Sequence, residues 1–197
     1  MARDERSTET GVLARPRVAG LLRAAARRRV TLVVAGGGFG KTTALRNFTA
    51  GDVIAGGSWL ALRQADRAVE VLAPRISAAL GTDALPGLSV RGGAMGAEDR
   101  HALAEGQAGL LCEAVERSGG HHTLVVDDLE QLGDKDSGTG LLRALCLQAP
   151  PGLHLMLCGR RLPRLGLGRL RGRGEVVEIA AGDLAFTPEE TAALLVA

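Results

Sequence analysis

The fold is decided by the stretch Val30-Thr-Leu-Val-Val-Ala-Gly-Gly-Gly-Phe-Gly-Lys-Thr-Thr43, in which an apolar strand pattern runs directly into a glycine-rich loop. Glycine lets such a loop curl so that several backbone N–H groups point at one polyphosphate, and the helix that follows adds its positive N-terminal end. Lys41 would reach the β- and γ-phosphates, and the Thr42 hydroxyl would complete the ligand shell of a Mg²⁺ ion. The stretch therefore predicts a phosphate-binding P-loop, with these candidate nucleotide-binding residues: Gly36, Gly37, Gly38, Phe39, Gly40, Lys41, Thr42 and Thr43.

The match to the strict P-loop pattern is one residue short. The pattern asks for glycine six positions before the lysine, where this chain has Ala35. Lys41 and Lys135 are the only lysines among 24 basic residues, so a lysine placed directly after Gly40 by chance is improbable. The alternative is an ordinary glycine-rich turn in a chain with 28 glycines, and the strand before and helix after the loop argue against it.

Length and composition limit the classes of protein that fit. A chain of 197 residues is long enough for one α/β domain with a substantial core. The net charge of +2 and the 2% aromatic content argue against a dedicated nucleic-acid surface, so we expect no direct DNA binding by this segment. Cys112, Cys146 and Cys158 lie far apart in apolar contexts and read as core residues of a reducing compartment. With no apolar run long enough to span a bilayer, we expect a cytoplasmic location and no membrane partner.

Strand and helix patterns alternate along the chain. Residues 1–12 are expected to be disordered, residues 13–197 to form one domain, and residues 81–97 are assigned no structure. Such alternation predicts an α/β fold with a mainly parallel sheet covered by helices on both faces. The expected strands are 31–34, 59–62, 123–127, 153–158 and 176–179. The expected helices lie at 18–29, after the P-loop, around 69–80, at 98–117, at 139–148 and from Thr187-Pro188 onwards.

Two acids, Asp127 and Asp128, end an all-apolar strand at the edge where parallel sheets gather their ligands. A buried carboxylate needs a positive partner, and Mg²⁺ bound to a nucleotide would supply one at Asp127. Asp128 stands where many P-loop ATPases carry the glutamate that polarises the attacking water. Glu130 is a poor substitute, because two residues beyond Asp128 the chain has left the strand. The alternative reading is a pair of acids in a turn after an edge strand.

Arginines follow the next predicted strand at the same edge of the sheet. Arg160 there can contact the γ-phosphate and stabilise the charge that moves during hydrolysis. The alternative is a solvated arginine in an arginine-rich loop. His121-His122 are interpreted as loop residues, since no third metal ligand is in view. The arginines of residues 164–173 could bind nucleic-acid phosphates, but the regular leucines among them favour a packed connection.

Taken in order, these motifs resemble the ATPase domain of the large MalT-like LuxR-family transcriptional regulators, which belong to the STAND class of AAA+-related P-loop ATPases. The segments that carry the resemblance are Pro16-Arg17, residues 33–43, Ser58-Trp-Leu-Ala-Leu62, Leu124-Val-Val-Asp-Asp128, Leu155-Met-Leu-Cys-Gly-Arg160 and Leu184-Ala-Phe-Thr-Pro-Glu-Glu190. They cover nearly the whole chain after residue 12, and an ordered set is far more specific than any one motif.

The resemblance implies a three-layer α/β/α sandwich with a five-stranded sheet and an ATP/ADP-driven switch reset by slow Mg²⁺-dependent hydrolysis. By position, residues 36–43 look like the Walker A motif, Asp127-Asp128 like Walker B and Arg160 like the sensor arginine, while Arg17 lies in the segment that flanks adenine. It also implies partner modules on a longer chain, including a DNA-binding helix-turn-helix, and ATP-dependent self-association.

The chain departs from the family pattern at three places. The family usually has Pro-Ala where this chain has Gly36-Gly37, which makes the loop more flexible. Its acidic stretch after Trp59 is here Arg63-Gln-Ala-Asp66, and the chain ends at Ala197 inside the last expected helix. We therefore expect a fragment that lacks the family's C-terminal modules.

Three functions remain open at this stage. The first is a switch domain that binds Mg·ATP through Lys41, Thr42 and Asp127, with slow ATPase activity that depends on Asp128 and Arg160. The second is a nucleotide-independent remnant that keeps the fold as an interaction domain. A metabolite kinase is the third, and it is weaker because no arginine-rich lid segment is identifiable.

Overall fold

One five-stranded sheet forms the centre of the molecule. The computed structural model describes residues 14–50, 57–82 and 96–196. Within these ranges the strand order is β2-β3-β4-β1-β5, and every neighbouring pair runs parallel. The strands are β1 (Val30–Val34), β2 (Gly57–Ala61), β3 (His122–Asp127), β4 (Leu153–Gly159) and β5 (Val176–Ala180). The predicted five-stranded parallel sheet is thus confirmed.

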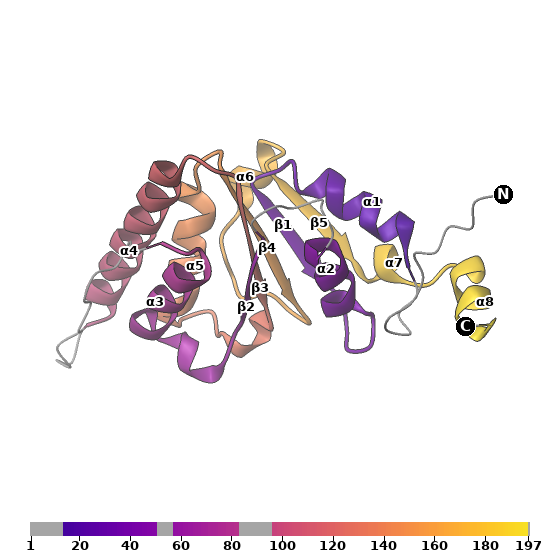
Figure 1. Ribbon diagram of the computed structural model, residues 1–197. Coiled ribbons are helices and arrows are strands. Elements are labelled where there is room, and N and C mark those ends of the chain that lie inside the picture. The colour runs from indigo at the N-terminus through magenta and orange to yellow at the C-terminus, as the bar shows by residue number, and fades with distance from the viewer. Residues whose placement is uncertain (1–13, 51–56, 83–95, 197) are drawn as a thin grey trace.

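Helices cover both faces of the sheet, as expected of a three-layer sandwich (Figure 1). On one face lie α3 (Val69–Ala79), α4 (Ala97–Ser118) and α5 (Ser137–Gln148), and on the other lie α1 (Pro16–Ala25) and α2 (Lys41–Ala50). Two 3₁₀ turns, η1 (Gln64–Arg67) and η2 (Leu129–Gln131), follow β2 and β3. The remaining helices are α6 (Gly168–Gly172), α7 (Ala181–Leu184) and α8 (Pro188–Val196).

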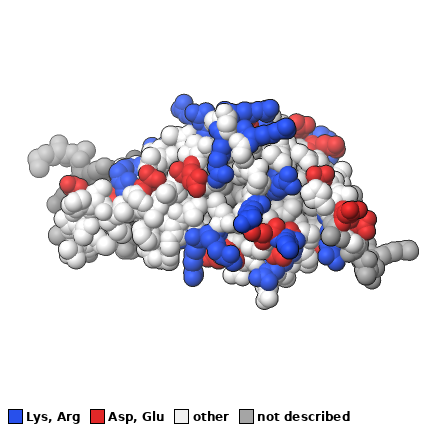
Figure 2. Space-filling view, turned by 180° about the vertical axis from the view of Figure 1, so that it is seen from behind, with Lys and Arg blue, Asp and Glu red and all other residues white. Residues whose placement is uncertain are grey.

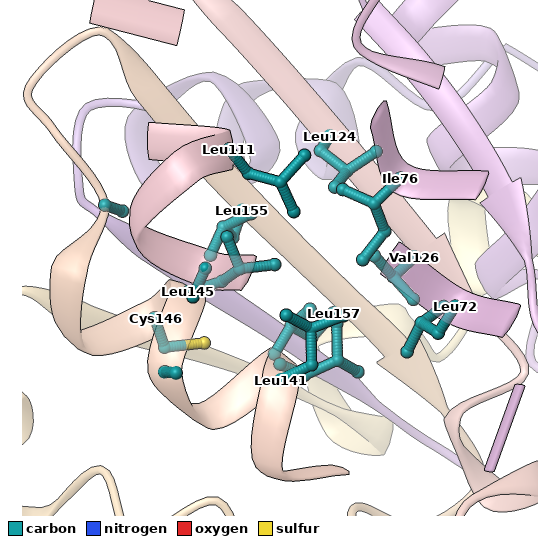
Figure 3. Packing of buried hydrophobic residues seen from close by; sticks show 14 of the residues in the cluster. Leu72, Ile76, Leu111, Leu124, Val126, Leu141, Leu145, Cys146, Leu155 and Leu157 are labelled. Carbon is teal, nitrogen blue, oxygen red and sulfur yellow. The ribbon is translucent and has the colours of Figure 1, made fainter. Parts of the chain in front are cut away.

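Alternating residues of each central strand supply two separate apolar cores. In β4, Leu155 and Leu157 pack towards α3, α4 and α5, whereas Met156 and Cys158 pack towards α1 and α2. Figure 3 shows the first core, where Leu155 and Leu157 lie with Leu145 of α5. A strand buried on both faces reads as one continuous apolar run, and all of β4 is buried. This double burial fixes the strand register and so the position of the residues at its end.

Several helices and strands begin or end at other residues than the sequence predicts. The first helix is Pro16–Ala25 rather than residues 18–29, which leaves Arg27 to Arg29 in the turn before β1. His122 opens β3 instead of lying in the loop, because its N–H bonds to the Gly152 carbonyl oxygen. Residues 1–12 and most of the 81–97 connection lie outside the described residues. Within residues 164–173, Leu165, Leu167 and Leu170 are buried, which confirms a packed connection.

The three cysteines are buried, as predicted for core residues. Burial raises the pKa of Cys112 to about 11 and that of Cys146 to about 12. Among the described helices, none has the length and apolar character needed to cross a membrane.

Candidate functional site

The predicted site residues meet in one cleft of about 390 Å³ at the edge where the strands end. The P-loop follows β1, Asp127 ends β3, and Gly159 ends β4, so three neighbouring strands deliver the lining. The lining consists of Gly37, Gly38, Gly40, Lys41, Thr42, Thr43, Asp127, Asp128, Glu130, Gly159 and Arg160. The sequence-predicted phosphate, metal and catalytic residues are thus brought together, apart from Arg17, Gly36 and Phe39, which do not line this cleft.

The glycines of the P-loop adopt a backbone that other residues rarely reach. Gly38 has φ 81° and Gly40 has φ 70°, both in the left-handed region. The helix α2 begins at Lys41, immediately after this turn. Lys41 Nζ donates to the carbonyl oxygens of Ala35 and Gly36, each at 2.8 Å. An ammonium has three N–H donors, so these two bonds leave one for a phosphate oxygen.

Asp127 is the buried acid of the cleft, with 4% of its surface exposed. Its Oδ2 accepts a hydrogen bond from Thr42 Oγ1 at 2.9 Å, and its Oδ1 accepts one from the Asp128 N–H at 2.9 Å. Burial first, and then the charge of Asp127, raise the pKa of the neighbouring Cys158 thiol. The two hydrogen bonds fix the direction of the Asp127 carboxylate and join it to the P-loop hydroxyl.

Thr42 and Asp127 fit one side of a Mg²⁺ site. Within the described ranges no group of three or more His, Cys, Asp or Glu side chains could hold a metal ion by itself. Mg²⁺ in nucleotide sites takes only one or two protein oxygens and completes its octahedron with phosphates and water. The hydroxyl–carboxylate pair, 2.9 Å apart, is a donor set of this kind.

Asp128 has an unusual backbone. It is the only described residue other than glycine with positive φ, at φ 61° and ψ 41°. Such a conformation costs energy in a non-glycine residue, although aspartate tolerates it better than most. Burial, followed by the charges of Asp127 and Glu130, raises the pKa of Asp128, while Arg160 and Lys41 act in the opposite direction. Three carboxylates and two cations thus share the cleft.

Glu130 was expected to be a poor substitute for Asp128 because the chain has left the strand there. It does leave the strand, in η2, but its carboxylate lines the cleft. Glu130 Oε2 accepts the Arg160 N–H at 3.0 Å, and Oε1 lies 3.0 Å from Arg160 Nε. A Cβ on Gly159 would lie 2.9 Å from Glu130 Oε2 and 3.1 Å from the Arg161 carbonyl oxygen, so a larger residue there would crowd the Glu130 carboxylate. The left-handed turn at Asp128 leads into η2, from which Glu130 reaches the cleft.

A second cleft, of about 550 Å³, adjoins the first and shares Gly38, Gly40 and Thr43 with it. Arg15, Val18 and Ala19 from the α1 region line it, together with Asn47 and Phe48 of α2 and Phe186. The Arg15 guanidinium lies over the Phe186 ring, 4.2 Å from its centroid. We call this the α1 cleft. Its polar rim and apolar wall suit a flat, uncharged ring next to a phosphate chain.

Arg15 and Arg17 hold the segment before α8. Arg15 Nη2 donates to the Leu184 and Ala185 carbonyl oxygens and to Glu190 Oε2 at 2.8–2.9 Å. Arg17 donates to the Asp183 and Ala185 carbonyl oxygens, each at 2.7 Å, and does not line the α1 cleft. The hydrogen bond from Arg15 holds the pKa of Glu190 down at about 2. Arg17, which the resemblance places in the segment that flanks adenine, thus supports the cleft from outside. Arg15, which was not predicted from the sequence, lines the cleft.

Comparison with known proteins identifies relatives for most of the chain. An HTH-type transcriptional regulator MalT from Serratia proteamaculans is 33% identical over 89% of this chain, and one from Yersinia pestis is 28% identical over 86%. The chain spans about a fifth of these relatives, 19% and 18% of their lengths. A STAND protein with a tetratricopeptide repeat sensor from Pyrococcus horikoshii has the same fold, with TM-score 0.51 and 17% identity over 93% of this chain and 25% of its own. No protein-family model matches the chain.

Proposed function

The chain is a MalT-like P-loop ATPase domain, and we propose that it binds Mg·ATP as the nucleotide-dependent switch of a transcriptional regulator. The observation that carries the proposal is the hydrogen bond of 2.9 Å between Thr42 Oγ1 and Asp127 Oδ2. It joins the phosphate-binding loop to the acid at the end of β3, which is the geometry that a phosphate-bound Mg²⁺ requires. The triphosphate would lie along the P-loop N–H groups, with Lys41 at its β- and γ-oxygens.

Asp127→Asn tests this proposal by removing the charge of the proposed Mg²⁺ ligand. We expect Mg²⁺ to tighten ATP binding to the unaltered chain, and we expect this gain to fall by about tenfold in the variant, because one charge-assisted metal ligand is lost. Calorimetric titration of ATP with and without Mg²⁺ measures both values. Asp134→Asn, which changes an exposed acid outside the cleft, is the control. An unchanged Mg²⁺ gain in a folded Asp127→Asn chain would contradict the assigned metal role.

We propose that the α1 cleft receives the adenine base. Phe186 is 46% exposed, so its ring offers a surface on which a base can stack. The Arg15 guanidinium lies over this ring, 4.2 Å from its centroid. The shared residues Gly38, Gly40 and Thr43 make this cleft continuous with the phosphate cleft, as a single nucleotide requires. Arg17 acts as a positioning residue, because it bonds the carbonyl oxygens of Asp183 and Ala185 just before Phe186.

Phe186→Ala separates binding of the base from binding of the phosphates. Because base–aromatic stacking contributes about 1–3 kcal/mol, we expect the affinity for ATP to fall about tenfold. The affinity for inorganic triphosphate should stay within about twofold, since it makes no base contact. Leu195→Ala, at an 82% exposed side chain, is the matched control. Equal losses for ATP and triphosphate would place the base elsewhere.

We propose that hydrolysis, where it occurs, uses Asp128 to orient the attacking water and Arg160 to stabilise the γ-phosphate charge. Both residues line the phosphate cleft. The raised pKa of Asp128, caused mainly by burial, makes its carboxylate a stronger base than an exposed aspartate. Glu130 is engaged by Arg160 at 3.0 Å and so holds the arginine in position instead of activating water.

Asp128→Asn and Glu130→Gln distinguish these roles. Because general-base catalysis contributes roughly 10²–10⁴-fold, we expect Asp128→Asn to lower kcat about 100-fold while ATP affinity changes little. Glu130→Gln should lower kcat less, because it loosens Arg160 and leaves the base intact. Phosphate release at saturating Mg·ATP is the measurement. A greater loss in Glu130→Gln than in Asp128→Asn would assign the base to Glu130.

The role in the larger regulator is also a proposal. The MalT relatives are about five times longer than the aligned segment, and we propose that DNA binding lies in other parts of such a chain. We propose that ATP occupancy changes how this domain contacts those parts or a second copy of itself. The element placed to transmit the change is α8, which Arg15 ties to the α1 cleft through Glu190 at 2.9 Å.

A further inference from the structure

We infer that a third cleft, at the edge of the sheet opposite the P-loop, binds a small phosphate-bearing anion. This basic cleft has a volume of about 590 Å³ and lies at the ends where β1, β3 and β4 begin. Its charged and titratable lining consists of Arg27, Arg28, Arg29, His121, His122 and His154. The nucleotide cleft uses the far ends of the same three strands, so the two sites are separate.

The cleft collects positive charge without compensating acids. None of the described residues that line it is acidic. Arg29 is neutralised from outside by Glu175, whose Oε2 lies 3.0 Å from Arg29 Nε. Arg27 and Arg28 form no ion pair with any other described residue and are exposed. Basic side chains gather along this edge of the molecule, which is the upper edge in Figure 2. Two uncompensated guanidiniums beside a concave surface favour an oxyanion ligand.

His154 supplies a second, independent sign of a ligand. Its residue surface is only 8% exposed, and its Nδ1 has no hydrogen-bond partner among the described residues. Thr31 Oγ1 lies within hydrogen-bond distance of the Ala25 carbonyl oxygen and 2.9 Å from His154 Nε2. Either Nε2 or the Thr31 hydroxyl is the donor in the contact with the ring, and in both tautomers Nδ1 is left without a partner among the described residues. Burial lowers the pKa of His154 to about 4, so the ring is neutral at pH 7.

An unpaired buried ring nitrogen is costly and calls for a hydrogen-bond partner. A ligand that carries both an oxyanion and a hydroxyl suits the arginines and either tautomer of the histidine, because its hydroxyl can donate to Nδ1 and its oxygens can accept from Nδ1–H. Phosphate monoesters and hydrogen phosphate both have this combination, and we assign the cleft to that chemistry.

The cleft is built by two connections held close together. The His122 N–H donates to the Gly152 carbonyl oxygen at 2.7 Å, and a Cβ on Gly152 would lie 2.8 Å from the Gly120 carbonyl oxygen. The Pro150-Pro151 pair adds a stiff wall. A cleft of about 590 Å³ with stiff walls suits a small molecule, since small-molecule pockets usually measure roughly 300–1,000 Å³. A nucleic-acid backbone would instead be expected on a longer, open basic surface.

The test uses the 197-residue chain with Lys41→Ala, which weakens phosphate binding at the P-loop so that it contributes little to the signal. Inorganic phosphate and glycerol phosphate are titrated separately by calorimetry at pH 7. We expect saturable binding at one site, and the added pair Arg27→Ala/Arg28→Ala should weaken it at least tenfold. Arg63→Ala/Arg100→Ala removes two exposed arginines outside the cleft and should leave the affinity unchanged. Tighter binding of the ester would identify an organic phosphate, and equal binding would identify free phosphate.

Imidazole resonances provide a readout that does not depend on mutation. We expect those of His122 and His154 to shift on addition of the phosphate probe, and that of the distant His101 to stay unchanged. The proposal is overturned if neither probe saturates, if both arginine pairs weaken binding equally, or if a single-stranded oligonucleotide binds more tightly than both probes. Because these measurements are made in the Lys41→Ala chain, their outcome is independent of whether the P-loop binds ATP.

Discussion

Lys41→Ala is expected to weaken ATP binding about 100-fold, which corresponds to about 2.7 kcal/mol. The lysine lies at the start of α2 and at the end of the P-loop, and it lines the phosphate cleft. Its ammonium is the one fixed cation of the loop, and charge-assisted hydrogen bonds to phosphate are among the strongest in proteins. The substitution also removes the bonds of 2.8 Å from Nζ to the Ala35 and Gly36 carbonyl oxygens, so the loop loses part of its own support.

Lys135→Ala provides a matched control, because Lys135 is the only other lysine of the chain and is exposed. It removes the same charge and should leave ATP affinity within about twofold. Thermal unfolding of both variants verifies that the fold is intact. If a folded Lys41→Ala chain bound ATP as tightly as the unaltered chain, the Mg·ATP switch would be wrong. Absence of ATP binding in the unaltered chain would favour a nucleotide-independent interaction domain.

The sheet and its main site could be predicted from sequence because burial leaves a simple pattern. Residues 31–34, 123–127 and 153–158 read as continuous apolar runs, since both faces of the central strands are covered. Parallel strands bring their carboxyl ends to one edge, so Lys41, Asp127 and Arg160 had to lie near one another. The fold expected from the family resemblance agrees with that argument and with the structural comparison.

The features of the site that the sequence did not predict depend on single backbone angles and on the direction of side chains. Glu130 returns to the cleft because Asp128 adopts φ 61°, which no pattern of apolar residues encodes. Arg15 and Arg17 are two residues apart around α1, so they point in different directions, and only Arg15 lines the α1 cleft. The basic cleft was missed because Arg27 to Arg29 and His121-His122 come together only through the strand order.

Gly138→Ala is expected to give the largest loss of stability, about 3 kcal/mol or more. Gly138 is buried in the first turn of α5, and a Cβ there would overlap the Asp66 carbonyl oxygen and lie 3.2–3.3 Å from further backbone atoms of η1. The obstacle is backbone, and η1 cannot shift easily. Asp66 is fully buried and paired with Arg75, its Oδ2 accepts the Arg63 N–H at 2.6 Å, and Ser137 Oγ accepts the Val69 N–H at 3.0 Å. Urea denaturation monitored by circular dichroism measures the change.

Gly140→Ala makes the same substitution in the same helix, where the nearest atom to the added Cβ would be the Ala104 Cβ at 3.6 Å. That is ordinary contact, and alanine favours a helix over glycine by up to about 1 kcal/mol, so this variant should be neutral or more stable. Helix propensity cancels between the two variants, and their difference isolates the overlap with η1. The consequence reaches the site, because Arg67 Nε of η1 donates to the Gln131 carbonyl oxygen of η2 at 2.8 Å, next to Glu130. A Gly138→Ala chain as stable as Gly140→Ala would mean that η1 yields without cost, which would contradict the view that η1 is a rigid support for η2.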